Sequence, residues 1–279
     1  MQSVLASIDL TEIVLLAASL LVTGALAGFV AGLLGVGGGI VIVPVLFYVF
    51  TLLGVDEDVK MHVAVGTSLS TIIATSAMSM RAHWRKGAVD VPMLKRWAVA
   101  IILGVVAGTL LAASVKGLAL TAVFGTVALI VSFHMGFSKP HWRVSDHPPR
   151  GVVEQVIAAG IGMVSAMMGI GGGTLSVPTL TLFNYPIHRA VGTAAAIGFL
   201  IGVPGTIGFV VGGLGAEDLP PFSFGYVNLL GLALILPTSM ALAPYGARAA
   251  HALPTGRLRL AFAVFLFLTG LRMLASSLG

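Results

Sequence analysis

The 279-residue sequence contains no cysteine and few charged residues. Without cysteine the chain has no disulfides, no thiolate metal sites and no cysteine nucleophile. Charged residues make up only 9% of the chain, whereas a soluble domain carries about 25%. Hydrophobic residues make up 57%, and several uncharged runs exceed the ~18 apolar residues that indicate a transmembrane helix. Together these features predict an all-α polytopic membrane protein.

Other absences narrow the function. The apolar runs carry no clear nucleophile–base pair and no cluster of metal ligands, so we do not expect an intramembrane enzyme, a metal site or a cofactor. The G-x-x-x-x-G-K-[ST] phosphate loop is missing, which argues against ATP-driven transport within this chain. The net charge of +5 does not indicate a nucleic-acid partner, because membrane proteins gather basic residues on one face for topological reasons.

A glycine-rich motif interrupts two of the apolar runs. Gly35-Val36-Gly37-Gly38-Gly39 is followed by Pro44, and Gly169-Ile170-Gly171-Gly172-Gly173 is followed by Pro178. Each glycine costs about 1 kcal/mol relative to alanine in a helix interior, and proline removes a backbone donor. We therefore predict that a membrane helix is broken at each motif.

The two motifs belong to an internal repeat. Residues 28–44 match residues 162–178 without a gap, and the hexapeptide 62–67 matches 188–193. Further on, the tetrapeptide 87–90 aligns loosely with 225–228. The repeat divides the chain into a first transmembrane repeat (1–137), a cytoplasmic connector (138–151) and a second transmembrane repeat (152–279).

The hydrophobic pattern predicts five membrane segments in each repeat. Their ranges are 12–34, 40–54, 62–80, 94–114 and 118–136 in the first repeat, and 152–168, 174–183, 189–211, 225–247 and 260–277 in the second. The second and seventh segments are too short to cross a hydrocarbon core of about 30 Å. We expect each to be a half-length helix paired with the segment before it.

Basic residues predict the orientation. Most of them lie in three stretches, 81–96, 139–150 and 248–259, which the positive-inside rule places in the cytoplasm. The acidic turn 56–58, the loop 213–224 and the N-terminus should then be periplasmic. Because the aligned loops fall on opposite sides, we predict that the repeats are inverted, which is typical of secondary transporters. The N-terminus lacks the basic region of a cleavable signal peptide, so the first segment should remain a membrane span.

The broken helices are the first candidate site. Consecutive glycines let backbone N–H groups point in one direction and bind an anion, and a half-helix starting near each proline adds its positive dipole end. The alternative is that small residues only allow close helix crossing. The candidate residues are Gly37, Gly38, Gly39, Pro44, Gly171, Gly172, Gly173, Thr174 and Pro178.

The second candidate site is the repeated hexapeptide and its surroundings. Gly66-Thr67-Ser68 and Gly192-Thr193 should open the third and eighth segments, where hydroxyls can bond a substrate oxygen. The alternative is that these hydroxyls bond the carbonyl one turn earlier. His62 and His188 occupy equivalent positions and could couple a proton to transport, or they could cap a helix end.

With G-x-G-G-G-x4-P and H-x-A-V-G-T each present twice, the sequence resembles the TauE/SafE family of sulfite exporters, also called 4-toluenesulfonate uptake permeases. The resemblance implies a secondary transporter of the bacterial inner membrane that moves sulfite, organosulfonates or related anions. Its partners would then be a small anionic substrate, membrane lipid and protons. The second repeat has Ala194 where the first has Ser68, so the polar site need not be symmetric. An anion- or proton-conducting channel is the alternative function.

Overall fold

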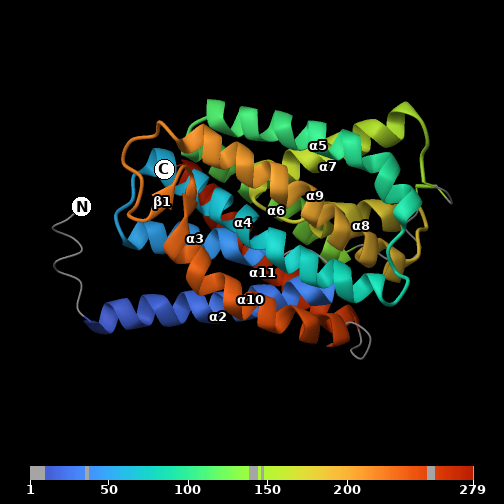
Figure 1. Cartoon of the computed structure of the whole chain (residues 1–279), viewed down its shortest axis with the longest axis horizontal. Coiled ribbons are helices and arrows are strands. Elements are labelled where there is room, and N and C mark those ends of the chain that lie inside the picture. The colour runs from blue at the N-terminus through green and yellow to red at the C-terminus, as the bar shows by residue number, and fades with distance from the viewer. Residues whose placement is uncertain (1–9, 35–37, 138–143, 146–147, 250–254, 279) are drawn as a thin grey trace.

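The structure is a computed structural model that describes residues 10–34, 38–137, 144–145, 148–249 and 255–278. Within these ranges the chain forms helices and one short hairpin (Figure 1). The first half contains α2 (Leu10–Leu34), α3 (Gly39–Leu52), α4 (Glu57–Trp84), α5 (Val91–Ser114) and α6 (Gly117–Phe137). The second half contains α7 (Val152–Met168), α8 (Gly173–Leu182), α9 (Ile187–Gly213), α10 (Leu229–Ala249) and α11 (Thr255–Leu278). Strand β1 (Ser223–Phe224) pairs antiparallel with β2 (Val227–Asn228) just before α10.

The helices have the composition of membrane spans. Among the described residues, α4, α5, α6, α9 and most of α10 are long and apolar enough to cross a membrane. Shorter apolar stretches occur in α2, α3, α7 and α11. The predicted all-α polytopic membrane protein is therefore confirmed.

Each predicted segment coincides with a helix, although three of the starts differ by four or five residues; α11, for example, begins at Thr255 rather than at residue 260. Helix α4 begins at Glu57 rather than at residue 62, because the Asp56 side chain accepts a hydrogen bond from the backbone N–H of Asp58 and caps the helix. Helix α10 begins at Leu229 rather than at residue 225, because residues 225–228 form part of the hairpin.

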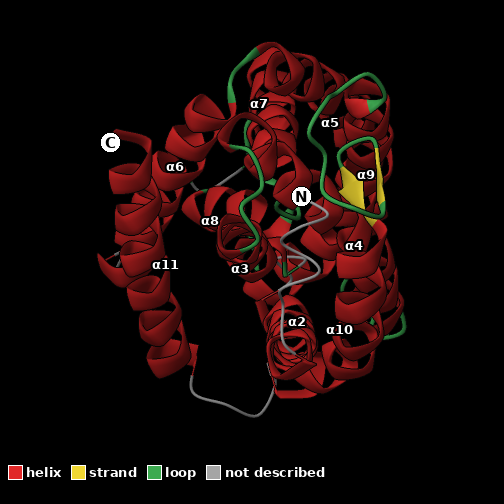
Figure 2. Cartoon of the chain, turned by 90° about the vertical axis from the view of Figure 1, so that its left-hand side faces the viewer, coloured by secondary structure: helices red, strands yellow, loops and turns green. Residues whose placement is uncertain are grey.

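The two short helices predicted at the glycine motifs are confirmed. Helix α3 has 14 residues and α8 has 10, which corresponds to lengths of about 21 and 15 Å. Neither length spans a hydrocarbon core of about 30 Å. In the end-on view of Figure 2, α3 and α8 lie in the middle, with α6 and α11 on one side and α4 and α9 on the other.

Helix packing joins the two halves along most of their length. The main pairs are α2 with α10, α5 with α7, α4 with α9, and α6 with α11. Under the sequence repeat, α2 corresponds to α7 and α5 corresponds to α10, so the pairs α2–α10 and α7–α5 are the same contact made twice. Each half therefore packs mainly against the other half.

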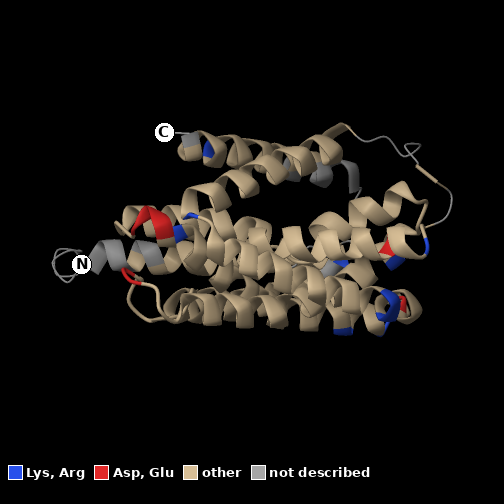
Figure 3. Ribbon diagram, turned by 90° about the horizontal axis from the view of Figure 1, so that it is seen from above, with Lys and Arg blue, Asp and Glu red and all other residues tan. Residues whose placement is uncertain are grey.

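Equivalent elements of the two halves run in opposite directions. In Figure 1, α4 and α9 are antiparallel, and the loops that follow them (85–90 and 214–222) lie at opposite ends of the bundle. Figure 3 shows the charged residues gathered towards the two ends, with an uncharged belt between them. These observations support the predicted inversion of the repeats.

Helix α3 lies at the centre of this packing. It is apolar on all sides, and Ile40, Ile42, Val43 and Leu46 are completely buried. A helix of this kind has to be enclosed by protein, and in a bilayer its contacts stabilise through van der Waals packing rather than removal from water. The enclosure places the first residue of α3, Gly39, in the interior.

Candidate functional site

The second glycine motif forms a buried break between α7 and α8. Helix α7 ends at Met168, and the next residue, Gly169, caps it with a left-handed backbone (φ 66°). The N–H of Ile170 bonds the carbonyl of Ser165 at 3.1 Å, as in a helix C-cap. Residues 169–173 are all buried, and α8 starts at Gly173. The chain is thus non-helical deep inside the protein, where membrane proteins tolerate it only if it is buried in protein or lines a cavity.

The first motif breaks the chain in a similar way. Residues 35–37, including the predicted site residue Gly37, lie outside the described residues. Gly38 has a left-handed backbone (φ 75°), and α3 starts at Gly39.

The proline positions correct one prediction. Pro44 and Pro178 lie inside α3 and α8, about one and a half turns after each start, so the half-helices do not begin near the prolines. The irregular backbone is confined to the glycines, which tolerate it, so each helix begins at the last glycine of its motif and before the proline. A proline at this depth removes the hydrogen bond to the carbonyl four residues earlier, which leaves the carbonyls of Ile40 and Thr174 without that donor.

The two motifs meet in the interior. The Ser68 hydroxyl, on α4, donates a hydrogen bond of 2.7 Å to the carbonyl oxygen of Gly169. A Cβ atom added at Gly39 would lie 2.1 Å from the same oxygen and 2.8 Å from Ser68 Oγ. We call Gly39, Ser68 and Gly169 the motif junction. It joins the start of α3, the middle of α4 and the end of α7, and hence both halves of the chain.

Buried hydroxyls without a partner surround the second motif. Within the described ranges, Ser76, Ser165, Thr174 and Ser176 have buried hydroxyl groups with no hydrogen-bond partner. Such groups are rare in folded proteins, and each is a candidate to meet a ligand or water. Ser165 lies one turn before Gly169, and Thr174 and Ser176 lie in the first turn of α8.

Ser76 and the start of α8 both lie next to Gly198 on α9. A Cβ atom added at Gly198 would lie 2.5 Å from Ser76 Oγ and 3.5 Å from the backbone nitrogen of Gly172. The Ser76 hydroxyl on α4 and a backbone amide at the N-terminal end of α8 therefore both lie beside Gly198 of α9. Hydroxyl and amide donors of this kind suit the oxygens of an anion.

Thr67 and Thr193 hold the loops of the opposite half. Thr67 Oγ1 accepts a hydrogen bond of 2.8 Å from the backbone N–H of Asn228, and Thr193 Oγ1 accepts one of 2.9 Å from the N–H of Asp90. Asp90 and Asn228 are aligned in the repeat, so the same contact is made at both ends of the bundle. We call these two contacts the cross-braces.

The glycines that precede the two threonines allow this approach. A Cβ atom at Gly66 would lie 2.2 Å from the Tyr226 carbonyl oxygen, and one at Gly192 would lie 2.5 Å from that of Ala88. Gly66 lies about two and a half turns inside α4, so the prediction that this block opens the segment is wrong. The physical reason is the earlier cap at Asp56. The structure brings Ser68 to the glycine motifs, whereas it assigns Thr67 and Thr193 to the cross-braces.

The two predicted histidines have different surroundings. His62 is 3% exposed, and its ring nitrogens each lie 2.9 Å from a backbone carbonyl oxygen, of Asp58 and of Ala112. His188 is exposed. Equivalence in the repeat therefore does not give the two residues the same role.

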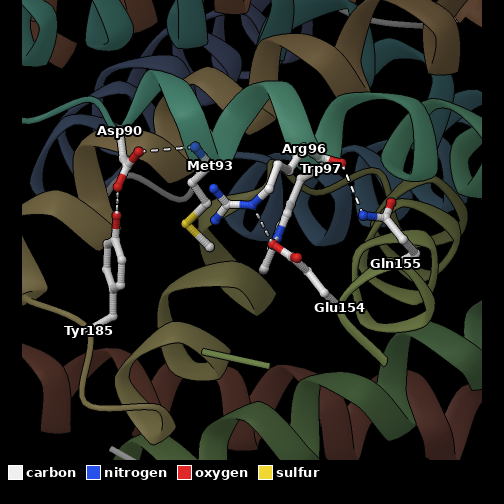
Figure 4. Close-up of polar contacts among 7 residues, drawn as sticks. All are labelled: Asp90, Met93, Arg96, Trp97, Glu154, Gln155 and Tyr185. Atoms are coloured by element: carbon white, nitrogen blue, oxygen red, sulfur yellow. Dashed lines mark hydrogen bonds and ion pairs between the residues drawn. The ribbon is translucent and has the colours of Figure 1, made fainter. Parts of the chain in front are cut away.

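At the end of the bundle that holds the 85–90 loop, Asp90 also receives a hydrogen bond from the hydroxyl of Tyr185 (Figure 4). Burial alone would raise the pKa of Asp90, but the hydrogen bonds from Tyr185 and the Met93 N–H, with the charges of Arg189 and Arg96, outweigh it and hold that pKa below its usual value. Burial, and then the Asp90 carboxylate, raise the pKa of Tyr185 well above its usual value.

A buried carboxylate that the sequence reasoning missed lies nearby. Glu154, at the start of α7, accepts hydrogen bonds from Arg96 Nε (3.0 Å) and Trp97 Nε1 (2.9 Å), as Figure 4 shows. Gln155 donates to the Arg96 carbonyl at 3.2 Å. This network fastens α5 to α7. A single carboxylate at the edge of an uncharged run was the signal available in the sequence.

The end of α4 borders a cavity of about 480 Å³, lined by Ala77, Met80, Arg81, Trp84 and Arg85. It lies on the predicted cytoplasmic side, just beyond Ser76 on the same helix. Two arginines at such an opening raise the local concentration of anions.

Comparisons with known proteins identify the class. The chain is 34% identical over 256 residues to a probable membrane transporter protein of Haemophilus influenzae, covering 91% of this chain and 96% of the relative. A probable membrane transporter protein of Methanocaldococcus jannaschii is 27% identical, with 81% and 84% covered. The probable membrane transporter protein YunE of Bacillus subtilis is 30% identical, with 70% and 78% covered. The fold and these relatives together define a membrane transporter.

The family follows from a more specific match. Residues 20–273 match the model of the sulfite exporter TauE/SafE family, so the chain belongs to the TauE/SafE family. No solved structure matches the chain significantly.

Proposed function

We propose that this protein is a secondary transporter of small sulfur-containing anions such as sulfite or organosulfonates, located in a bacterial inner membrane. The anion would bind near the midplane, at the buried hydroxyls and backbone amides around the second glycine motif. The observation that carries the proposal is that the unpartnered Ser76 hydroxyl and the Gly172 backbone amide both lie beside Gly198, while Thr174 and Ser176 in the first turn of α8 also have buried hydroxyls without a partner. Support for an anion comes from the donors available there, and support for sulfur chemistry comes from the family alone.

The type of donor fits a transported anion. A sulfite or sulfonate group presents three acceptor oxygens, which hydroxyls and amides can satisfy together. The hydroxyl donors among the described residues here are neutral side chains: Ser76, Thr174 and Ser176. Neutral donors bind an anion less tightly than an arginine would, because charge-assisted hydrogen bonds are roughly twice as strong. Weaker binding favours release, which each transport cycle requires.

The arrangement of the halves fits alternating access. The cross-braces tie the loops of one half to the helices of the other at both ends of the bundle. The proposed anion site lies between them. If the braces at the two ends opened in turn, the site would be exposed first to one side and then to the other, as in transporters built from inverted repeats.

A thermal-shift panel with sulfite, sulfate, thiosulfate, taurine and sulfoacetate tests the proposal on the purified protein. A ligand at 100 times its dissociation constant stabilises the folded state by about 2.7 kcal/mol, so a true substrate should raise the midpoint clearly. If no sulfur oxyanion in the panel raises it, the proposed substrate class is wrong.

Serine variants locate the site. Ser76→Ala removes a buried hydroxyl without a partner, so the protein without ligand should be as stable as the wild type or more stable. Its shift with the active anion should nevertheless shrink. Ser132→Ala is the matched control, because the Ser132 hydroxyl donates to the Ala263 carbonyl at 2.7 Å between α6 and α11. The control should lose stability and keep its full ligand shift. An unchanged shift in Ser76→Ala would place the anion elsewhere.

Flux into proteoliposomes separates a carrier from a channel. Saturable uptake that accelerates when the same anion is present on the far side identifies a carrier. A conductive current without saturation identifies an anion channel and would overturn the secondary-transport proposal.

A further inference from the structure

His62 has an unusual set of hydrogen-bond partners. Its Nδ1 lies 2.9 Å from the carbonyl oxygen of Asp58, one turn earlier on α4, and its Nε2 lies 2.9 Å from the carbonyl oxygen of Ala112, near the end of α5. The side chain is 3% exposed, so water does not compete freely for either nitrogen.

The two partners can only accept hydrogen bonds. A carbonyl oxygen has no proton to donate, and neutral imidazole carries a proton on one nitrogen only. In either neutral tautomer, one ring nitrogen would direct its lone pair at a carbonyl oxygen. Only the doubly protonated imidazolium donates to Asp58 and Ala112 at the same time. The positions of the two carbonyl oxygens around His62 therefore match the two donors of an imidazolium.

One of the two carbonyl oxygens belongs to the end of α5. Ala112 lies in the last turn of α5, which ends at Ser114. The last carbonyls of a helix lack intrahelical donors and carry partial negative charge, which suits a nearby cationic donor. The Ala112 carbonyl already accepts a hydrogen bond of 3.4 Å from the Val115 N–H, and an imidazolium at His62 would add a second donor and a positive charge.

Other ionisable groups surround this position. The turn between α5 and α6 packs on the start of α4, since a Cβ atom at Gly117 would lie 2.4 Å from the Glu57 carbonyl oxygen. The ionisable side chains on the elements packed here are Tyr226 in the hairpin, Lys116 in the turn, and Asp58, Glu57 and Lys60 on α4. Glu57 and Lys60 form an ion pair with each other, so neither charge acts on His62 alone.

His62 also contacts the element that one cross-brace holds. Its ring stacks on Tyr226 with centroids 4.9 Å apart and an angle of 30° between the planes. Tyr226 lies two residues before Asn228, whose N–H donates to Thr67. The imidazole thus joins α4, the end of α5 and the hairpin, at the end of the bundle that carries the acidic turn 56–58.

We infer that His62 is the proton-binding site through which this transporter couples a proton to anion movement. With the proton bound, Nδ1–H fixes the ring against its own helix α4, and Nε2–H donates to Ala112, which holds α5 against α4 and keeps this end closed. When Nε2 gives its proton to water, its lone pair faces the Ala112 carbonyl, and the repulsion weakens the contact between α4 and α5 beside the hairpin. The inference about coupling rests on the proposed transport function, whereas the inference about proton binding does not.

The protonation state can be read without any substrate. In the wild-type protein with ¹⁵N-labelled histidine, reconstituted in nanodiscs, the NMR signals of His62 are those that disappear in His62→Gln. We expect both ring nitrogens to show imidazolium shifts and attached protons at mildly acidic pH, and one of them to lose its proton within the range of about pH 5 to 8 that histidine commonly covers. A neutral ring with one bare nitrogen throughout this range would overturn the proton site.

Transport variants test the coupling, with sulfite as the probe and a pH-sensitive dye inside proteoliposomes. His62→Gln keeps a side-chain N–H donor that can face Ala112 but cannot titrate. It should retain the sulfite thermal shift and lose the acceleration of sulfite flux by a pH gradient. His188→Gln, at the equivalent but exposed position, should keep the acceleration. Equal acceleration in His62→Gln and the wild type would overturn the coupling role.

The outcomes distinguish the two proposals. If the wild type shows no thermal shift with sulfite or any other anion of the panel while His62 is doubly protonated, the anion function fails and the proton site stands. If sulfite binds and moves while His62 stays neutral, the proton site fails and the anion function stands.

Discussion

Substituting Gly39 by alanine tests whether the two glycine motifs are in contact. The added Cβ atom would lie 2.1 Å from the Gly169 carbonyl oxygen, which is backbone and cannot rotate away. Forcing an extra carbon into a packed interior costs about 1–3 kcal/mol. If α3 and α7 separate to make room, the hydrogen bond from Ser68 to Gly169 is lost as well, which adds about 0.5–1.5 kcal/mol. We therefore expect Gly39→Ala to lower the free energy of unfolding by about 2–4 kcal/mol.

The control is Gly160→Ala in α7. A Cβ atom at Gly160 meets no atom within 4 Å, and alanine in a helix interior is favoured over glycine by up to about 1 kcal/mol. This variant should be as stable as the wild type or more stable. Equilibrium unfolding in mixed micelles, followed by circular dichroism, measures both variants. If Gly39→Ala falls within about 0.5 kcal/mol of the wild type, the size of an ordinary surface change, the motifs are not in contact as described.

A double-mutant cycle sharpens the result. Ser68→Ala alone leaves the buried carbonyl oxygen of Gly169 without this donor and should destabilise by about 1–3 kcal/mol. In the Gly39→Ala background the bond is already broken, so Ser68→Ala should cost much less there. Strict additivity of the two changes would show that they act independently and would refute the motif junction.

Two further predictions concern the ends of the bundle. Thr67→Val leaves the backbone N–H of Asn228 without its acceptor, and Thr193→Val does the same to that of Asp90. Each variant should lower the free energy of unfolding by about 1–3 kcal/mol. Because the two sites lie at opposite ends of the bundle, the double variant should show the sum of the two losses, and a strongly non-additive result would contradict separate braces. Tyr185→Phe removes a hydrogen bond that lowers the pKa of Asp90, so that pKa should rise towards its usual value of about 3.9. A carboxyl whose pKa is lowered by folding contributes stability that is present above the usual pKa and is lost as the pH falls through the folded-state pKa. The wild type should therefore have a larger free energy of unfolding than Tyr185→Phe near neutral pH, and this difference in free energy should narrow in acid. A difference that stays constant between neutral and acidic pH would exclude Asp90 as the cause.

The sequence predicted the helices well, although not the hairpin of β1 and β2, for a simple physical reason. In a bilayer every backbone group must be satisfied within its own helix, so long apolar runs leave few alternatives to helices. The same constraint makes the glycine motifs conspicuous, since Gly169 and Gly38 adopt left-handed backbones, the first at the end of α7 and the second just before the start of α3. The breaks between α2 and α3 and between α7 and α8 could therefore be predicted from the sequence alone.

The candidate site was predicted only in part. Ser68 was identified and does contact the second motif. Ser165 and Ser176 were missed, although they flank the motif in an apolar run, because a serine that bonds its own helix and a buried serine without a partner look the same in sequence. Glu154 was missed for a related reason, since its partners Arg96 and Trp97 come from another helix and no local pattern records them.

The sequence by itself determined the ten helical segments, the two breaks and the pairing of equivalent positions in the two halves. Only the tertiary structure decided what each equivalent position touches. Thr67 and Thr193 follow the same motif, and both reach across to the other half. His62 and His188 also follow the same motif, yet one is buried against two carbonyl oxygens and the other is exposed. Helix formation depends on neighbours along the chain, whereas burial and hydrogen-bond partners depend on which helices pack together.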